Sequence, residues 1–196
     1  MLSRRFALFS LLLSCTVAFS QAPAFRDSLP QHGDAYAGYW FVSSDAGFSG
    51  ASSGSNNGLN AGVDIMAFKW VSFAGEFDMG FGKVTNATSK TFTGLFGPRV
   101  FLPIPGAPKL TPFAEVLFGG THVSIGNSPD SRVSTSSVTA LIGGGADYRI
   151  LRRLLWRGQF GYLYNQNITL INSEVQNVPN PPVLHLQFST GPVFRF

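Results

Sequence analysis

The fold of this chain is decided by the stretch VSFAGEFDMGFG, which runs from Val71 to Gly82. Large apolar side chains alternate along it with polar or small ones. Phe73 and Phe77 fall on one side, whereas Glu76 and Asp78 fall on the other. Successive side chains of a β-strand point to opposite faces, so a period of two predicts a strand with one apolar and one polar face.

The last residues of the chain, VLHLQFSTGPVFRF, repeat this alternation. One face carries apolar side chains and ends on an aromatic residue, and the other carries His185, Gln187 and Arg195. The same alternation recurs along the chain and predicts eight strands. They are expected at residues 34–45, 57–68, 71–83, 90–103, 110–123, 136–149, 154–166 and 183–196.

The connections between these strands alternate in length. Short ones are Lys69-Trp70, PIPGAPK from Pro103 to Lys109, and ILRR from Ile150 to Arg153. The longer ones are polar and contain AGFSGASSGSN, VTNATS, SIGNSPDSRVST and NITLINSEVQNVPNPP. Short periplasmic turns and longer extracellular loops are typical of a transmembrane β-barrel of the outer membrane. The sequence therefore predicts an all-β, antiparallel, up-and-down barrel of eight strands.

The first residues read as a secretory signal peptide rather than as part of the fold. Arg4 and Arg5 precede an apolar run from Phe6 to Phe19, and small residues follow at the cleavage spacing. We expect a cleaved signal peptide at 1–20, a short periplasmic segment at 21–33 and the barrel at 34–196. A membrane-spanning helix would need a longer apolar run. Lipoprotein processing at Cys15 is a second alternative, since LLSC loosely resembles a lipobox.

Composition excludes several classes of function. Charged residues make up 12% of the chain, which is little for a water-facing surface. The net charge of +4 includes Arg4 and Arg5 of the leader, so the remaining excess is too small for nucleic-acid binding. Cys15 is the only cysteine, which leaves no thiol for a disulfide, a zinc site or a nucleophile after cleavage. No cofactor or metal is expected.

A barrel of this kind must pair its last strand with its first, because closure leaves no exposed sheet edge. From Asp34 to Phe196 the chain resembles the small eight-stranded outer-membrane barrels of the OmpA and OmpX type. The segment GGGADYRILRRLLWRGQFGYLY is similar to the sixth and seventh strands of OmpA-like barrel domains. The resemblance implies that the alternating last strand is the signal read by the barrel assembly machinery. Its apolar residues are Leu184, Leu186, Phe188, Phe194 and Phe196.

The polar faces of the strands predict a network of ion pairs inside the barrel. An eight-stranded barrel is just wide enough to be filled by side chains, and a buried charge needs a partner. The favoured interpretation is a structural plug without a wide pore, and the alternatives are a gated ion path and a pair of hydrolytic carboxylates. The residues expected in this network are Asp64, Glu76, Asp78, Arg99, Glu115, Asp147, Arg149, Arg157 and Arg195.

Two further motifs have a chemical and a structural interpretation. His122 and Ser124 form a His-x-Ser pair that resembles the site of outer-membrane lipid A deacylases, in which serine is the nucleophile and histidine the base. Those enzymes also use a carboxylate about a dozen residues further on, where this chain has Ser136 and Ser137, and the nearby acid, Asp130, lies in a loop. The triple glycine from Gly143 to Gly145 is interpreted as close packing of strands rather than as a phosphate cradle, since no helix follows it.

Lipid-facing aromatic side chains are expected in two belts. The periplasmic belt contains Trp70, Tyr148 and Trp156, and the outer belt contains Phe81, Phe92, Tyr162 and Tyr164.

The sequence thus predicts a monomeric outer-membrane protein of a Gram-negative-type bacterium, without enzymatic activity and with a structural or adhesive role. Its expected partners are outer-membrane lipid, lipopolysaccharide and the assembly machinery. A lipid-modifying enzyme and a soluble, lipocalin-like periplasmic barrel are the alternatives.

Overall fold

The protein is an all-β barrel in the computed structural model, which describes residues 32–43, 55–84, 87–126, 133–167 and 183–196. All eight predicted strands are present, and no strand end differs from its predicted position by more than three residues. The predicted signal peptide and most of the segment 21–33 lie outside the described residues. The strands are β1 (Gly33–Ser43), β2 (Ser55–Phe68), β3 (Val71–Val84), β4 (Ala87–Phe101), β5 (Leu110–Ile125), β6 (Val133–Arg149), β7 (Leu154–Asn167) and β8 (Val183–Arg195).

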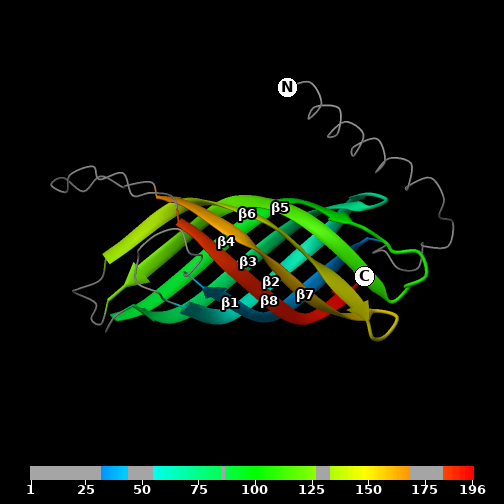
Figure 1. Ribbon diagram of the computed structural model, residues 1–196, viewed down its shortest axis with the longest axis horizontal. Coiled ribbons are helices and arrows are strands. Elements are labelled where there is room, and N and C mark those ends of the chain that lie inside the picture. The colour runs from blue at the N-terminus through cyan, green and yellow to red at the C-terminus, as the bar shows by residue number, and fades with distance from the viewer. Residues whose placement is uncertain (1–31, 44–54, 85–86, 127–132, 168–182) are drawn as a thin grey trace, which may run out of the picture.

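Each strand pairs antiparallel with the next one in the chain, and β8 pairs with β1 to close the barrel. The first and last strands therefore lie side by side, as the blue and red ribbons show (Figure 1). The backbone closes this seam at its end, where Phe196 N donates to Gly33 O at 3.0 Å and Gly33 N to Phe196 O at 3.3 Å. The predicted closed, up-and-down architecture is confirmed.

Burial follows the period of two predicted from the sequence. On β4 the inward Thr93 and Arg99 are fully buried, whereas the outward Phe92 and Phe96 are exposed. The decisive stretch on β3 behaves in the same way, with Phe73 and Phe77 outside and its carboxylates inside. The barrel is therefore apolar outside and polar inside, which is the reverse of the pattern expected of a lipocalin-like barrel in water.

The inside of the barrel is layered along its axis. On β4 the leucine Leu95 lies between Thr93 toward one end and Arg99 toward the other. Thr93 belongs to a ladder of hydroxyls, in which Thr121 lies 3.0 Å from it and accepts from Thr139 at 2.8 Å. A leucine layer separates this hydroxyl ladder from the charged side chains beyond it. The leucine layer consists of Ala74, Leu95, Leu117, Leu141 and Leu163.

Glycines make room for the aromatic side chains that fill the barrel. The ring of Tyr36 covers Gly62, where an added Cβ would come within 2.5 Å of the ring. Trp40 covers Gly80 in the same way, at 2.3 Å. At Gly143, Gly144 and Gly145 an added Cβ would meet backbone oxygens of neighbouring strands at 2.2–2.4 Å. Close strand packing therefore explains the triple glycine, as predicted.

The outward aromatic residues lie as predicted, with one correction. Tyr148, Trp156, Phe81, Phe92, Tyr162 and Tyr164 are all exposed on the outer surface. Trp70 is instead half-buried and packs against Phe101 and Phe113 inside the barrel, because it lies in the turn that leads from β2 to β3. On β8, Phe188, Phe194 and Phe196 are exposed on the outer face.

Among the residues that the structure covers, no helix is long and apolar enough to cross a membrane.

Candidate functional site

The charged layer of the lumen contains two arginines that share one carboxylate. Arg99, from β4, donates to Asp64 at 2.6 Å, to Glu76 at 2.6 Å and to Glu115 at 2.5 Å. The β4–β5 register places Arg99 directly opposite Glu115, and both are fully or almost fully buried. One guanidinium thus binds carboxylates from β2, β3 and β5.

Arg157, from β7, extends this network to the far side of the lumen. It donates to both oxygens of Asp147, at 2.7 and 2.9 Å, and to Asp64 Oδ2 at 2.8 Å. The Oδ2 atom of Asp64 therefore accepts hydrogen bonds from Arg99 and Arg157. A fork of two parallel hydrogen bonds to one carboxylate is the strong form of an arginine pair.

A third arginine joins the strands that close the barrel. Arg195 Nε, on β8, donates to Asp34 Oδ1, on β1, at 3.0 Å. Asp34 also lies 3.7 Å from Arg157, which links this pair to the rest of the layer. Gln159, on β7, donates to Glu76, on β3, at 3.0 Å. The network thereby includes side chains from all eight strands, since β6 contributes Asp147.

Aromatic rings lie against the two central guanidinium groups. The Cζ atom of Arg157 lies 4.6 Å from the ring centroid of Tyr36 and 5.0 Å from that of Phe113. The corresponding distances for Arg99 are 5.6 Å and 4.6 Å. Stacking on a ring face adds a cation–π attraction where water is excluded.

Two residues predicted to join this network take other positions in the barrel. Asp78 is fully buried on the inward face of β3, but neither of its carboxylate oxygens has a hydrogen-bond partner among the described residues. It lies two residues further along β3 than Glu76, opposite Asn60 and Thr93 and so beside the hydroxyl ladder. Arg149 is half-buried and donates a hydrogen bond to Pro108 O, which ties β6 to the β4–β5 turn.

Sequence reasoning missed four members of the network: Asp34, Tyr36, Phe113 and Gln159. Asp34 was detectable in principle, because closure of the barrel brings the start of the first strand to the end of the last. Tyr36 and Phe113 carried no such signal, since their parity alone does not distinguish a ring that stacks on arginine from one that only fills space.

Buried salt bridges cross the lumen in this layer. Across the parts of the chain that the structure describes, Arg99, Arg157 and Arg195 pair with five buried carboxylates, and the exposed fractions of the three arginines are 0%, 2% and 8%. No group of three or more possible metal ligands occurs within those same parts. The chemical role that this network can fill is structural, because its charge-assisted hydrogen bonds hold the eight strands in register.

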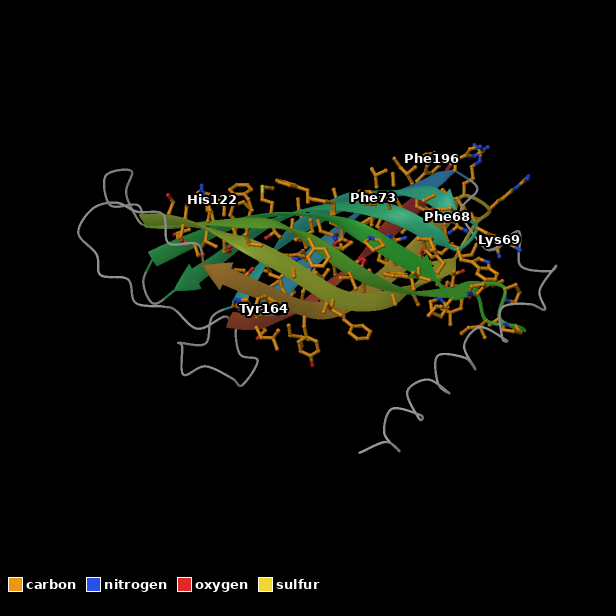
Figure 2. All side chains as sticks on the ribbon, turned by 90° about the horizontal axis from the view of Figure 1, so that it is seen from above. Phe68, Lys69, Phe73, His122, Tyr164 and Phe196 are labelled. Atoms are coloured by element: carbon orange, nitrogen blue, oxygen red, sulfur yellow. The ribbon has the colours of Figure 1, made fainter. Side chains whose placement is uncertain are left out.

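A second cluster lies on the outer face, toward the other end of the barrel (Figure 2). His122 Nδ1 lies 2.9 Å from Ser136 Oγ, and His122 Nε2 lies 3.4 Å from Ser124 Oγ. The His-x-Ser pair therefore points outward, and its third partner is a hydroxyl. Asp130, the nearby acid named from the sequence, lies outside the described residues.

The fold is that of small eight-stranded outer-membrane barrels. Neisserial surface protein A is 15% identical, with a TM-score of 0.62 over 84% of this chain and 96% of that one. The attachment invasion locus protein Ail of Yersinia pestis is 14% identical, with a TM-score of 0.55 over 86% of this chain and 100% of that one. The N-terminal β-barrel domain of Pseudomonas aeruginosa OprF is 14% identical, with a TM-score of 0.52 over 86% of this chain and 100% of that one. No protein-family model matches the sequence, and no curated protein matches it at significant similarity. At sequence identities this low, the comparisons show a shared fold and nothing more.

Proposed function

We propose that this chain is an outer-membrane β-barrel protein of a Gram-negative-type bacterium with a structural or adhesive role in the envelope. The observation that carries the proposal is the reversal of polarity across the barrel wall. Phenylalanines such as Phe77, Phe96 and Phe160 are more than half exposed outside, while charged side chains are buried inside. Such a surface is stable in lipid and costly in water.

The plugged lumen favours a structural or surface role over transport. An arginine that binds three carboxylates across the lumen leaves no passage for a solute through the charged layer. Two of the similar structures carry names that concern the cell surface and attachment, Neisserial surface protein A and the attachment invasion locus protein. These names support adhesion as one form that the role could take, with a monomer inserted by the assembly machinery among lipopolysaccharide.

Ester hydrolysis at His122 is the second candidate, supported by the chain of contacts from Ser124 through His122 to Ser136. One observation weighs against it. The group that contacts Nδ1 is a hydroxyl, which stabilises an imidazolium far less than a carboxylate does. We therefore propose no enzymatic activity.

The proposal is tested by cell fractionation together with planar-bilayer recording. We expect the protein in the outer-membrane fraction, in a form whose electrophoretic mobility changes on heating, and no large conductance steps in the bilayer. Recovery from the soluble periplasm would contradict the membrane location, and porin-sized steps would contradict the plug. Adherence of cells with and without the protein to host-cell surfaces then separates an adhesive from a structural role.

A further inference from the structure

Charge is distributed very unevenly over the barrel. All six acidic side chains within the described residues are buried in the lumen: Asp34, Asp64, Glu76, Asp78, Glu115 and Asp147. Four exposed cations lie in the three short turns, which meet at one end of the barrel. Lys69 lies in the β2–β3 turn, Lys109 in the β4–β5 turn, and Arg152 and Arg153 in the β6–β7 turn. We call these four residues the turn-end collar.

The turns with the collar residues also expose large apolar side chains. Phe68, next to Lys69, is 75% exposed, and Leu151, next to Arg152, is 63% exposed. The β4–β5 turn likewise exposes Leu102 and Ile104. Each turn thus pairs a cation with apolar side chains. Figure 2 shows Phe68 and Lys69 together with Phe196 at one end of the barrel, far from His122.

We propose that the turn-end collar binds the headgroups of anionic phospholipids. The inference rests on the proposed membrane location. Apolar side chains at the rim enter the boundary between headgroups and acyl chains, while lysine and arginine extend to the phosphates. Each such cation near an anionic surface adds to the attraction, and no acidic side chain on the described outer surface opposes it.

The geometry of the turns brings several of these cations into one sector. Arg149 N donates to Lys109 O at 2.8 Å, so the β4–β5 turn adjoins the end of β6. Arg195 N donates to Arg153 O at 2.9 Å, which places the β6–β7 turn between this point and the end of β8. Lys109, Arg152 and Arg153 therefore stand on neighbouring turns that the backbone holds in place. A headgroup bound between these turns would contact more than one cation.

The adjoining apolar side chains distinguish a lipid from an acidic polymer. A cell-wall or polysaccharide ligand would satisfy Lys109, Arg152 and Arg153 but would leave Phe68 and Leu151 against water. A phospholipid accommodates both kinds of side chain at once. At the opposite end the described residues include the exposed Lys90, which lies beside the polar Ser124 rather than beside an apolar turn. Lys90 therefore offers a matched control.

The experiment uses the folded chain in detergent, titrated with short-chain phosphatidylglycerol or phosphatidylcholine. The variant Lys69→Gln/Lys109→Gln/Arg152→Gln/Arg153→Gln removes the collar charges, and Lys90→Gln removes one charge at the other end. We expect wild type to prefer phosphatidylglycerol, the collar variant to lose at least ten-fold of that affinity, and Lys90→Gln to retain it. The preference should weaken as salt is raised, because exposed charges are screened.

Further measurements separate the possible outcomes. Equal affinity of wild type and collar variant for phosphatidylglycerol would overturn the inference, as would an equal loss in Lys90→Gln. Binding to purified peptidoglycan without a preference for phosphatidylglycerol would assign the collar to the cell wall and overturn the lipid assignment. If the chain folds into phosphatidylcholine vesicles but shows no preference for the phosphatidylglycerol headgroup, the headgroup inference is refuted and the proposed membrane location is not. A chain that enters no vesicle refutes the proposed membrane location as well.

Discussion

Asp34 on the first strand and Arg195 on the last strand are bonded across the seam of the barrel, 161 residues apart in the chain. Their α-carbons are direct partners in the β1–β8 register, and Asp34 is fully buried. A charge pair at this position fixes which residues of the two closing strands meet. A slip of one residue would turn one of the two charges toward lipid.

The first prediction concerns this seam. Asp34→Asn and Arg195→Gln should each lower the free energy of unfolding, and the double variant should lose less than the sum of the two. The expected coupling is about 1–3 kcal/mol, as for side chains in direct contact. Denaturant unfolding of the folded barrel in vesicles measures it. Strictly additive losses would mean that the two side chains act independently.

Arg157 should matter more than Arg195. Arg157→Gln removes the fork on Asp147 and one of the two hydrogen bonds that Asp64 accepts from arginine. Breaking a buried pair by removing one partner costs about 3–5 kcal/mol, because a charge remains without its partner. The exposed Lys90→Gln variant should stay within about 0.5 kcal/mol of wild type. A similarly small change for Arg157→Gln would mean that water reaches the charged layer.

Two glycines offer a matched test of packing. Gly62 lies beneath the ring of Tyr36, whereas no atom lies within 4 Å of a Cβ added at Gly75, on the outer face of β3. Gly62→Ala should destabilise the barrel by about 1–3 kcal/mol through overpacking. Gly75→Ala should be neutral or slightly stabilising. Equal effects in unfolding experiments would show that Tyr36 moves away at little cost.

Alternation in the sequence was enough to predict the architecture of the barrel. In β3 and β8 the side chains obey a period of two without interruption, and this period is a local property that needs no knowledge of neighbouring strands. The same parity placed Arg99, Arg157 and Glu115 inside. Trp70 departed from it because a turn residue is not bound by strand parity.

Partner choice inside the lumen could not be predicted in the same way. Which carboxylate an arginine meets depends on the stagger between strands, which parity leaves open. Asp78 illustrates this, since it shares a face with Glu76 but lies one inward position further along, beyond the reach of Arg99 in the described network. Arg149 lies at the edge of the barrel, where a turn carbonyl competes for its guanidinium.

The cluster around His122 gives a prediction about activity. Ser124→Ala should leave the lipid A of cells that produce the protein unchanged, because the orienting group on Nδ1 is the hydroxyl of Ser136. Mass spectra of lipid A from cells with wild type, with the variant and without the protein provide the measurement. Loss of one acyl chain only in the presence of wild type would establish the hydrolase instead. A Ser136→Glu variant tests whether a carboxylate alone would confer activity.

The end of β8 gives the last prediction. Phe196 and Phe118 are similarly exposed on the outer face, at 50% and 52%. Changing either to alanine removes a similar apolar area, so the two variants should fold equally well into vesicles in vitro. If Phe196 belongs to the signal read by the assembly machinery, only Phe196→Ala should reduce the amount of folded barrel in the outer membrane of cells. Quantifying the heat-modifiable form in both settings separates recognition from stability. Equal yields of the two variants in cells would remove any special role for the terminal aromatic residue.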